Sequence, residues 1–92
     1  MKPFRLKLYI AGRVMQSLRA IDNLQRICDE QRPGQYDLTI IDVLEHPAVL
    51  ESENITHTPL VVREAPLPKK RSLGDLTRDV ETFIKTFELY PD

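Results

Sequence analysis

Side chains able to do nucleophilic, redox or metal chemistry are few in this chain and stand far apart. The single cysteine, Cys28, excludes an internal disulfide and any redox site that needs two thiols. His46 and His57 are the only histidines, and neither has a second ligand at a spacing typical of zinc sites. The sequence contains no glycine-rich phosphate loop and no Gly-x-Ser-x-Gly motif. We therefore expect no catalytic residue, no metal and no cofactor.

Charge is the chemical property that the sequence distributes unevenly. Lys and Arg number 13 against 14 Asp and Glu, whereas a nucleic-acid-binding domain would be clearly basic, so we expect no nucleic-acid partner. Basic residues gather in residues 1–26 and in the run Lys69-Lys70-Arg71, and residues 33–62 contain acids but no Lys or Arg. If these segments lie on different faces, the asymmetry would steer a protein partner. The alternative is a set of ordinary solvated faces.

The length and hydropathy of the chain limit its class. A chain of 92 residues allows one domain, which we expect to span residues 1–92. No apolar run approaches the roughly 20 residues of a membrane span. Arg5 and Lys7 interrupt the apolar residues near the N-terminus, so this segment does not resemble a signal peptide. Together with the lone cysteine, these features predict a cytoplasmic protein without a membrane partner.

The first half of the chain predicts a strand, a helix and a second strand. Apolar and polar residues alternate over Phe4–Ile10, as in a strand with one buried face. Apolar residues then recur at helical spacing over residues 16–30, beginning with Leu18 and including Cys28. The apolar run Leu38–Leu44 favours a central strand covered on both faces. Two strands joined by a helix should lie parallel, with a right-handed crossover.

Beyond residue 46 the expected elements are shorter. A helix of one or two turns, a strand over residues 60–63 and an edge strand over residues 69–73 should follow one another. A final helix is expected over residues 76–90, with Asp75 or Thr77 as its cap. The resulting order, β-α-β-α-β-β-α, predicts an α/β sandwich of the thioredoxin kind.

A working thioredoxin carries its two cysteines at the first strand-to-helix turn, where the helix lowers the thiol pKa. The corresponding segment, Gly12–Ser17, has no cysteine, which excludes disulfide exchange by that route. Cys28 lies on the apolar stripe and is better interpreted as a buried structural thiol. A thioredoxin-like redox or stress protein acting through Cys28 stays open as an alternative. Tyr9, Arg13 and Arg19 are expected on a basic rim beside this turn, because tyrosine and arginine often anchor protein interfaces.

Five short motifs carry a resemblance that covers almost the whole chain. They stand in the order and spacing of the KaiB family of bacterial circadian clock proteins. The motifs are Leu6-Lys7-Leu8-Tyr9-Ile10-Ala11-Gly12, Ser17-Leu18-Arg19-Ala20, Ile41-Asp42-Val43-Leu44, Thr58-Pro59 and Gly74-Asp75-Leu76. The sequence is also similar to the sensor domain of the clock-output histidine kinase SasA.

The resemblance implies a non-enzymatic protein that binds KaiC, a hexameric ATPase, and competes with a SasA-like histidine kinase. It also implies two folds. One is a thioredoxin-like monomer that binds partners, and the other is a tetrameric ground state in which the C-terminal segment forms a strand. A homo-oligomer, dimer or tetramer, is therefore an alternative form. Because thioredoxin-like folds place a cis-proline before the third strand, we predict a cis Thr58–Pro59 bond.

The sequence differs from the clock proteins at positions that bear on which of the two folds it adopts and on which partner it binds. Clock KaiB proteins have Gly and Asp where this chain has Lys85 and Phe87, and both changes favour a helical C-terminal segment. Other departures favour a paralogue that serves a different KaiC, or a role in stress-response signalling. The resemblance and the charge pattern give two sets of residues. The expected partner-binding residues are Tyr9, Arg13, Arg19, Lys69, Lys70 and Arg71, and the expected fold-determining residues are Pro59, Gly74, Asp75, Lys85 and Phe87.

Overall fold

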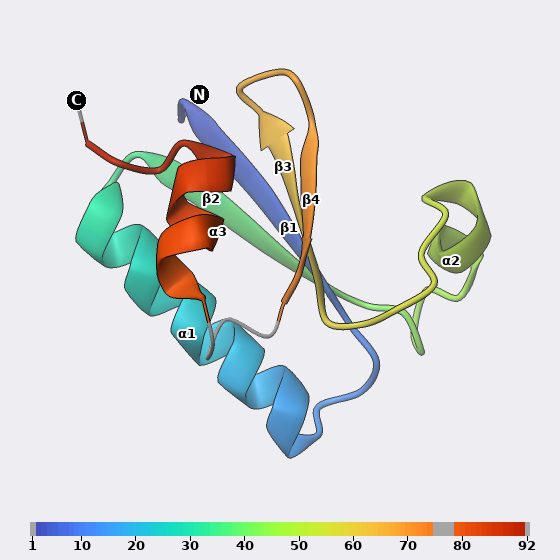
Figure 1. Cartoon of the computed structure of the whole chain (residues 1–92). Helices are drawn as coiled ribbons and strands as arrows, with labels where there is room; N and C mark the ends of the chain where they lie inside the picture. Colours follow the sequence, from blue (N-terminus) through green and yellow to red (C-terminus); the bar gives the residue numbers. More distant parts are fainter. Residues whose placement is uncertain (1, 75–78, 92) are drawn as a thin grey trace.

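The computed structural model describes residues 2–74 and 79–91 (Figure 1). Seven elements follow one another in the predicted β-α-β-α-β-β-α order, and two helices and a four-stranded sheet make up most of the structure. The elements are β1 (Phe4–Ile10), α1 (Met15–Gln31), β2 (Tyr36–Asp42), α2 (Ala48–Ser52), β3 (Leu60–Ala65), β4 (Lys70–Leu73) and α3 (Val80–Phe87). Within the described ranges, no helix combines the length and the hydropathy that a membrane crossing requires.

The sheet has the strand order β2-β1-β3-β4. β1 is parallel to β2, as the strand-helix-strand pattern predicts, and antiparallel to β3, which is antiparallel to β4. The prediction of β4 as an edge strand is confirmed. The prediction of a central strand over Leu38–Leu44 is wrong, because β2 lies at the opposite edge.

The wrong prediction for β2 is explained by the way its side chains alternate between the two faces of the sheet. Leu38 and Ile40 pack against the core, whereas Asp37 and Thr39 are exposed on the other face. Ile41 packs instead against a second, smaller apolar cluster near α2. The run is therefore apolar because two separate clusters use its two faces, and not because strands flank it on both sides.

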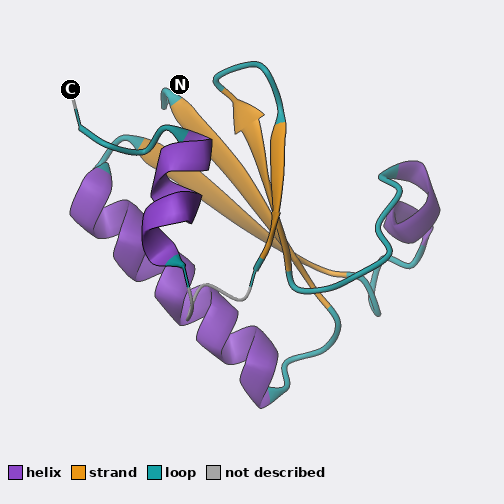
Figure 2. Ribbon diagram, viewed as in Figure 1, coloured by secondary structure: helices purple, strands orange, loops and turns teal. Residues whose placement is uncertain are grey.

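The main core lies between one face of the sheet and the two longer helices. Figure 2 shows α1 and α3 on the same side of the sheet, with α2 set apart beyond the ends of β2 and β3. Phe87 is fully buried there, and its ring centroid lies 4.5 Å from that of Phe83. Cys28 is also fully buried in this cluster, as predicted. Leu18 was expected in the same stripe, but it is 44% exposed, and its neighbour Ser17 is the buried residue of the first turn of α1.

The C-terminal segment is helical in this structure. α3 begins later than predicted, and its cap is Asp79, whose carboxylate accepts a hydrogen bond from the Thr82 backbone N–H at 3.0 Å. The expected caps, Asp75 and Thr77, lie outside the described residues. Lys85 is exposed on the outer face of α3, two residues from each of the buried Phe83 and Phe87, so the apolar stripe of the helix is intact.

A buried arginine, not anticipated from the sequence, ties β3 to the end of α3. Arg63 has no exposed surface, and its guanidinium donates to the Phe87 carbonyl at 2.7 Å and to the Pro68 carbonyl at 2.9 Å. The Glu88 carboxylate lies 3.8 Å away. A cation at the carboxyl end of a helix also interacts favourably with the helix dipole. The signal in the sequence was one charged residue inside an apolar strand.

A proline just before β3 and a glycine just after β4 are in close contact. The Thr58–Pro59 peptide bond is cis, as predicted. Gly74 donates its backbone N–H to the Pro59 carbonyl at 2.7 Å, and a Cβ on Gly74 would come within 2.7 Å of the Pro59 Cβ. Any larger residue at position 74 would therefore push these two segments apart.

Candidate partner-binding surface

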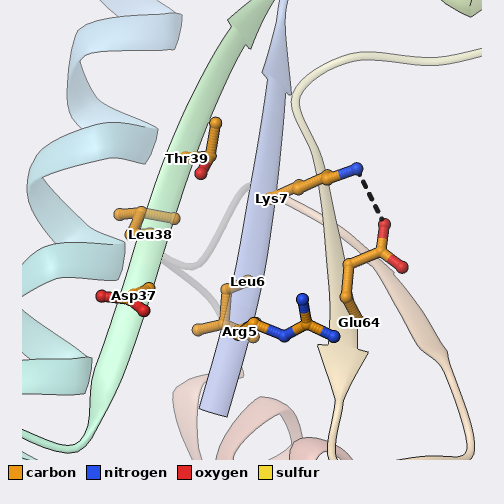
Figure 3. Close-up of a pocket in the computed structure, with 7 residues that line it drawn as sticks. All are labelled: Arg5, Leu6, Lys7, Asp37, Leu38, Thr39 and Glu64. Carbon is orange, nitrogen blue, oxygen red and sulfur yellow. Dashed lines mark ion pairs between the residues drawn. The ribbon is translucent and has the colours of Figure 1, made fainter. Parts of the chain in front are cut away.

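The face of the sheet opposite α1 and α3, here named the open face, carries charged side chains. The register places Arg5 and Lys7 of β1 beside Asp37 and Thr39 of β2. With Glu64 of β3 they line a hollow of about 500 Å³ (Figure 3). Charges of both signs therefore meet on one face, in contrast to the separation into basic and acidic faces that the sequence suggested.

Glu64 is the centre of a small ionic network on the open face. Its carboxylate lies 3.3 Å from the Lys7 ammonium and 3.1 Å from the Lys69 ammonium (Figure 3 shows the first pair). Burial raises the pKa of Glu64, but the hydrogen bonds from the two lysines outweigh this and lower it overall. The same contact with Glu64 raises the pKa of Lys69. Glu64 and Lys69 therefore stay ionised at neutral pH and present a fixed pattern of charge to a partner.

The basic run Lys69-Lys70-Arg71 does not form one patch. Lys70 stands opposite Arg63 in the register and so belongs to the helix-covered face, whereas Arg71 stands opposite Val62 on the open face. The Arg71 guanidinium donates to the Asn54 carbonyl at 3.1 Å. Lys69 joins it on the open face through its contact with Glu64. The alternation of the edge strand thus separates residues that are adjacent in sequence.

Tyr9 is not on an exposed rim. Its side chain is 1% exposed and packs in a cluster with Val43, Ile55 and Leu60, where the segment around α2 covers part of the open face. Burial, the largest cause, raises the pKa of Tyr9, so its phenol stays protonated at neutral pH. The structure therefore places Tyr9 under the open face, beside Lys69 and Arg71 in a cavity of about 190 Å³.

Arg13 and Arg19 form a separate exposed group at the start of α1. Large apolar side chains also lie exposed at this end of the molecule, between 44% and 69% accessible. They are Val14, Met15, Leu18 and Leu44. Arg19 lies on α1, which covers the other side of the sheet (Figure 2), and Arg13 lies in the turn between β1 and α1, so neither arginine is on a strand of the open face.

Asp42 fixes the loops at the end of β1 and β2. Its carboxylate accepts hydrogen bonds from the backbone N–H of Gly12 at 2.9 Å and of Leu44 at 3.0 Å. These bonds, the Gly12 bond first, lower the pKa of Asp42. The interpretation of Asp42 as a loop anchor, rather than a reactive group, agrees with this geometry.

Two kinds of chemistry find little support in the structure. Burial raises the pKa of the Cys28 thiol to about 12, which is the opposite of the shift that activates a thiolate. In the part of the chain that the structure describes, no group of three or more His, Cys, Asp or Glu side chains could hold a metal ion.

Comparisons with known proteins agree with the fold and with the motifs. The KaiB domain family matches residues 7–84. The chain belongs to the KaiB family. A circadian clock protein KaiB3 of Synechocystis is 39% identical over 95% of this chain and 84% of its own length. The circadian clock oscillator protein KaiB of Synechococcus elongatus is 38% identical over 97% of this chain and 87% of its own length.

Solved structures of other proteins share the thioredoxin-like fold of this chain. The N-terminal domain of Synechococcus elongatus SasA matches with a TM-score of 0.77 at 21% identity, over 97% of this chain and 86% of that one. Chloroplastic thioredoxin z matches with a TM-score of 0.73 at 20% identity, over 95% and 80%. The fold class expected from the sequence is thereby confirmed.

Proposed function

We propose that this KaiB-family protein is a non-enzymatic adaptor that docks a KaiC-type hexameric ATPase through its open face. The observation that carries the proposal is the hollowed, charged open face on a scaffold that lacks a reactive thiol. Relatives named as circadian clock proteins support a role in a clock or in related stress-response signalling. The adaptor is expected to act in the cytoplasm as a single domain.

Lys69 and Arg71 are the basic contacts of this proposed surface at the smaller cavity. Lys7 lines the larger hollow, where it pairs with Glu64. A partner with exposed carboxylates would replace water around them, and long-range attraction would speed its approach. Arg13 and Arg19, at the start of α1, would contact a second part of a ring-shaped partner. Lys70, on the helix-covered face, would add to the long-range electrostatic attraction without contacting the partner at the open face.

The likeness to the SasA N-terminal domain supports a second part of the proposal, competition. Two proteins with the same fold can occupy one site on an ATPase ring in turn. A homo-oligomer of this chain would then be a resting form in which the partner-binding residues are not accessible to the ring.

The test is binding of the purified protein to a purified KaiC-type ATPase from the same host. We expect saturable binding that weakens as salt rises from 50 to 500 mM, roughly, because exposed charges are screened. A SasA-type sensor domain should displace the protein from the ring. Failure to bind at low salt, with a folded protein and an assembled hexamer, would contradict the proposed function.

A thiol-labelling experiment tests the redox alternative. Native Cys28 should react with a maleimide far more slowly than the unfolded protein does, because the thiol is fully buried and has a raised pKa. Labelling at the rate of the unfolded chain would instead favour a redox role.

A further inference from the structure

A cavity of about 190 Å³ lies on the open face, beside the segment that follows α2. Its lining is mixed, with two apolar residues at the base, two cations, one acid and one phenol. The lining residues are Tyr9, Glu53, Ile55, Val62, Lys69 and Arg71. Since a water occupies roughly 30 Å³ in the liquid, the cavity has room for a small polar group and a few waters.

The phenol of Tyr9 has an unused hydrogen-bonding capacity in this cavity. Among the described residues, none forms a hydrogen bond with its hydroxyl, although the side chain is 1% exposed. The Tyr9 hydroxyl is also not among the enclosed polar atoms that lack a partner, since Arg63 Nε is the one such side-chain atom in the described residues. The Tyr9 hydroxyl is therefore not enclosed but open to the cavity that its side chain lines. The hydroxyl can therefore bond to water or to a ligand that enters the cavity.

The charges around the phenol define the ligand that would satisfy it. Lys7, Glu53, Glu64 and Lys69 all lie near enough to influence the Tyr9 pKa, and Arg71 lines the same cavity. These groups comprise three cations and two carboxylates, so the cavity region carries one net positive charge. Because the raised pKa keeps the phenol protonated, its hydroxyl can donate to an anion.

We infer that this cavity is a subsite for a single carboxylate group, which accepts hydrogen bonds from Tyr9, Lys69 and Arg71. Lys7 holds Glu64 when Lys69 turns towards the ligand, so the ionic network is kept. Glu53 opposes a second negative charge, and the site therefore prefers a carboxylate to a doubly charged phosphate. The carboxylate comes either from an Asp or Glu side chain of a docked partner or from a small free acid. Only the first source rests on the proposed function.

The test is an NMR titration of the isotope-labelled protein with sodium acetate, with sodium chloride keeping the ionic strength constant. We expect saturable shifts confined to the residues that line the cavity. Tyr9→Phe and Lys69→Gln should each weaken acetate binding by about tenfold, as loss of a hydrogen bond to a charged group does. Tyr36→Phe is the matched control, because the Tyr36 hydroxyl donates to Asp29 and lies outside the cavity. Its acetate affinity should equal that of the unmodified protein.

A second titration, with sodium phosphate, tests the role of Glu53. Phosphate should bind more weakly than acetate, and Glu53→Gln should reverse this order. Linear shifts without saturation, or equal affinity in Tyr9→Phe, would overturn the subsite whether or not a partner is known. Measuring the affinity of Tyr9→Phe for the ATPase then separates the sources. A loss of about tenfold assigns the carboxylate to the partner, and an unchanged affinity assigns it to a free acid.

Discussion

The two faces of the sheet use neighbouring residues of the same strands for different purposes. On the helix-covered face, Leu6 and Leu8 are buried beneath α1 and α3 together with aromatic rings. On the open face, one step along β1, Arg5 and Lys7 line a charged hollow. Because side chains alternate between the two faces of a strand, residues for stability and residues for recognition are adjacent in sequence but separate in space, and each set can change without the other. Four variants test how complete this separation is.

The largest effect should follow a change on the helix-covered face. Phe87→Asp combined with Lys85→Gly places a charge in the core and a flexible residue in α3. We expect the free energy of unfolding to fall by at least about 3 kcal/mol, since core Phe→Ala changes already cost that much. The helical NMR shifts of residues 80–87 should be lost in dilute solution.

Thr86→Asp is the control for this variant, because it puts the same charge one residue away on the exposed side of α3. It should leave the helical shifts in place. Persistence of helical shifts in the double variant would show that packing of Phe87 does not determine the conformation of this segment.

Arg63→Leu should produce the second-largest effect. The change leaves the carbonyls of Phe87 and Pro68 without their donor inside the protein. We expect a loss of about 2–3 kcal/mol by chemical denaturation, in the range for unsatisfied buried acceptors. Arg63→Lys, which keeps the charge but fewer donors, should lose less. Wild-type stability in Arg63→Leu would mean that water satisfies these carbonyls equally well.

Asp42→Asn should change the response to acid at the end of the sheet. The folded protein lowers the pKa of Asp42 below its ordinary value of 3.8, so the ionised carboxylate stabilises the fold above that pH. This contribution is lost as the pH falls through the lower, folded-state pKa. The variant should therefore be less stable than the unmodified protein at pH 7, and the difference should shrink in strong acid. A constant difference across this range would argue against the charge-based anchor, and the exposed Asp37→Asn serves as the comparison.

The smallest effect on stability should come from the open face. Lys69→Met removes one partner of Glu64, but Lys7 remains, and the Lys69 side chain is 54% exposed. Exposed ion pairs contribute little, so we expect the free energy of unfolding to change by no more than about 0.5 kcal/mol. Thermal denaturation would check this value. A large loss would show that the open face is part of the structural core as well.

The sequence was sufficient for the elements whose period is clear. β1, α1 and β4 follow from alternation, an apolar stripe and the lysine-rich edge, and the buried position of Cys28 follows from the same stripe. The position of β2 could not be derived, because an apolar run does not reveal whether strands or separate clusters cover it. Strand order is a property of long-range pairing rather than of local pattern.

The candidate site was only partly predictable for a related reason. Lys69 and Arg71 were identified by charge, but their separation from Lys70 depends on the register of β4. Glu64 was missed because one acid beside apolar residues gives no signal until two lysines from other segments meet it. Tyr9 was expected on a rim, and the cluster around α2 buries it instead.

Whether the open face binds the ATPase is tested by two matched variants, Arg71→Glu on the open face and Arg26→Glu on α1. Both reverse one exposed arginine, and Arg26 pairs only locally, with Asp22 and Asn23, among the described residues. The measurement is the affinity of each variant for the KaiC-type ATPase at low and high salt. If the open face is the binding surface, Arg71→Glu weakens binding by at least about tenfold and flattens its salt dependence, while Arg26→Glu stays within about twofold of the unmodified protein. Equal losses in the two variants, or a greater loss in Arg26→Glu, would contradict it.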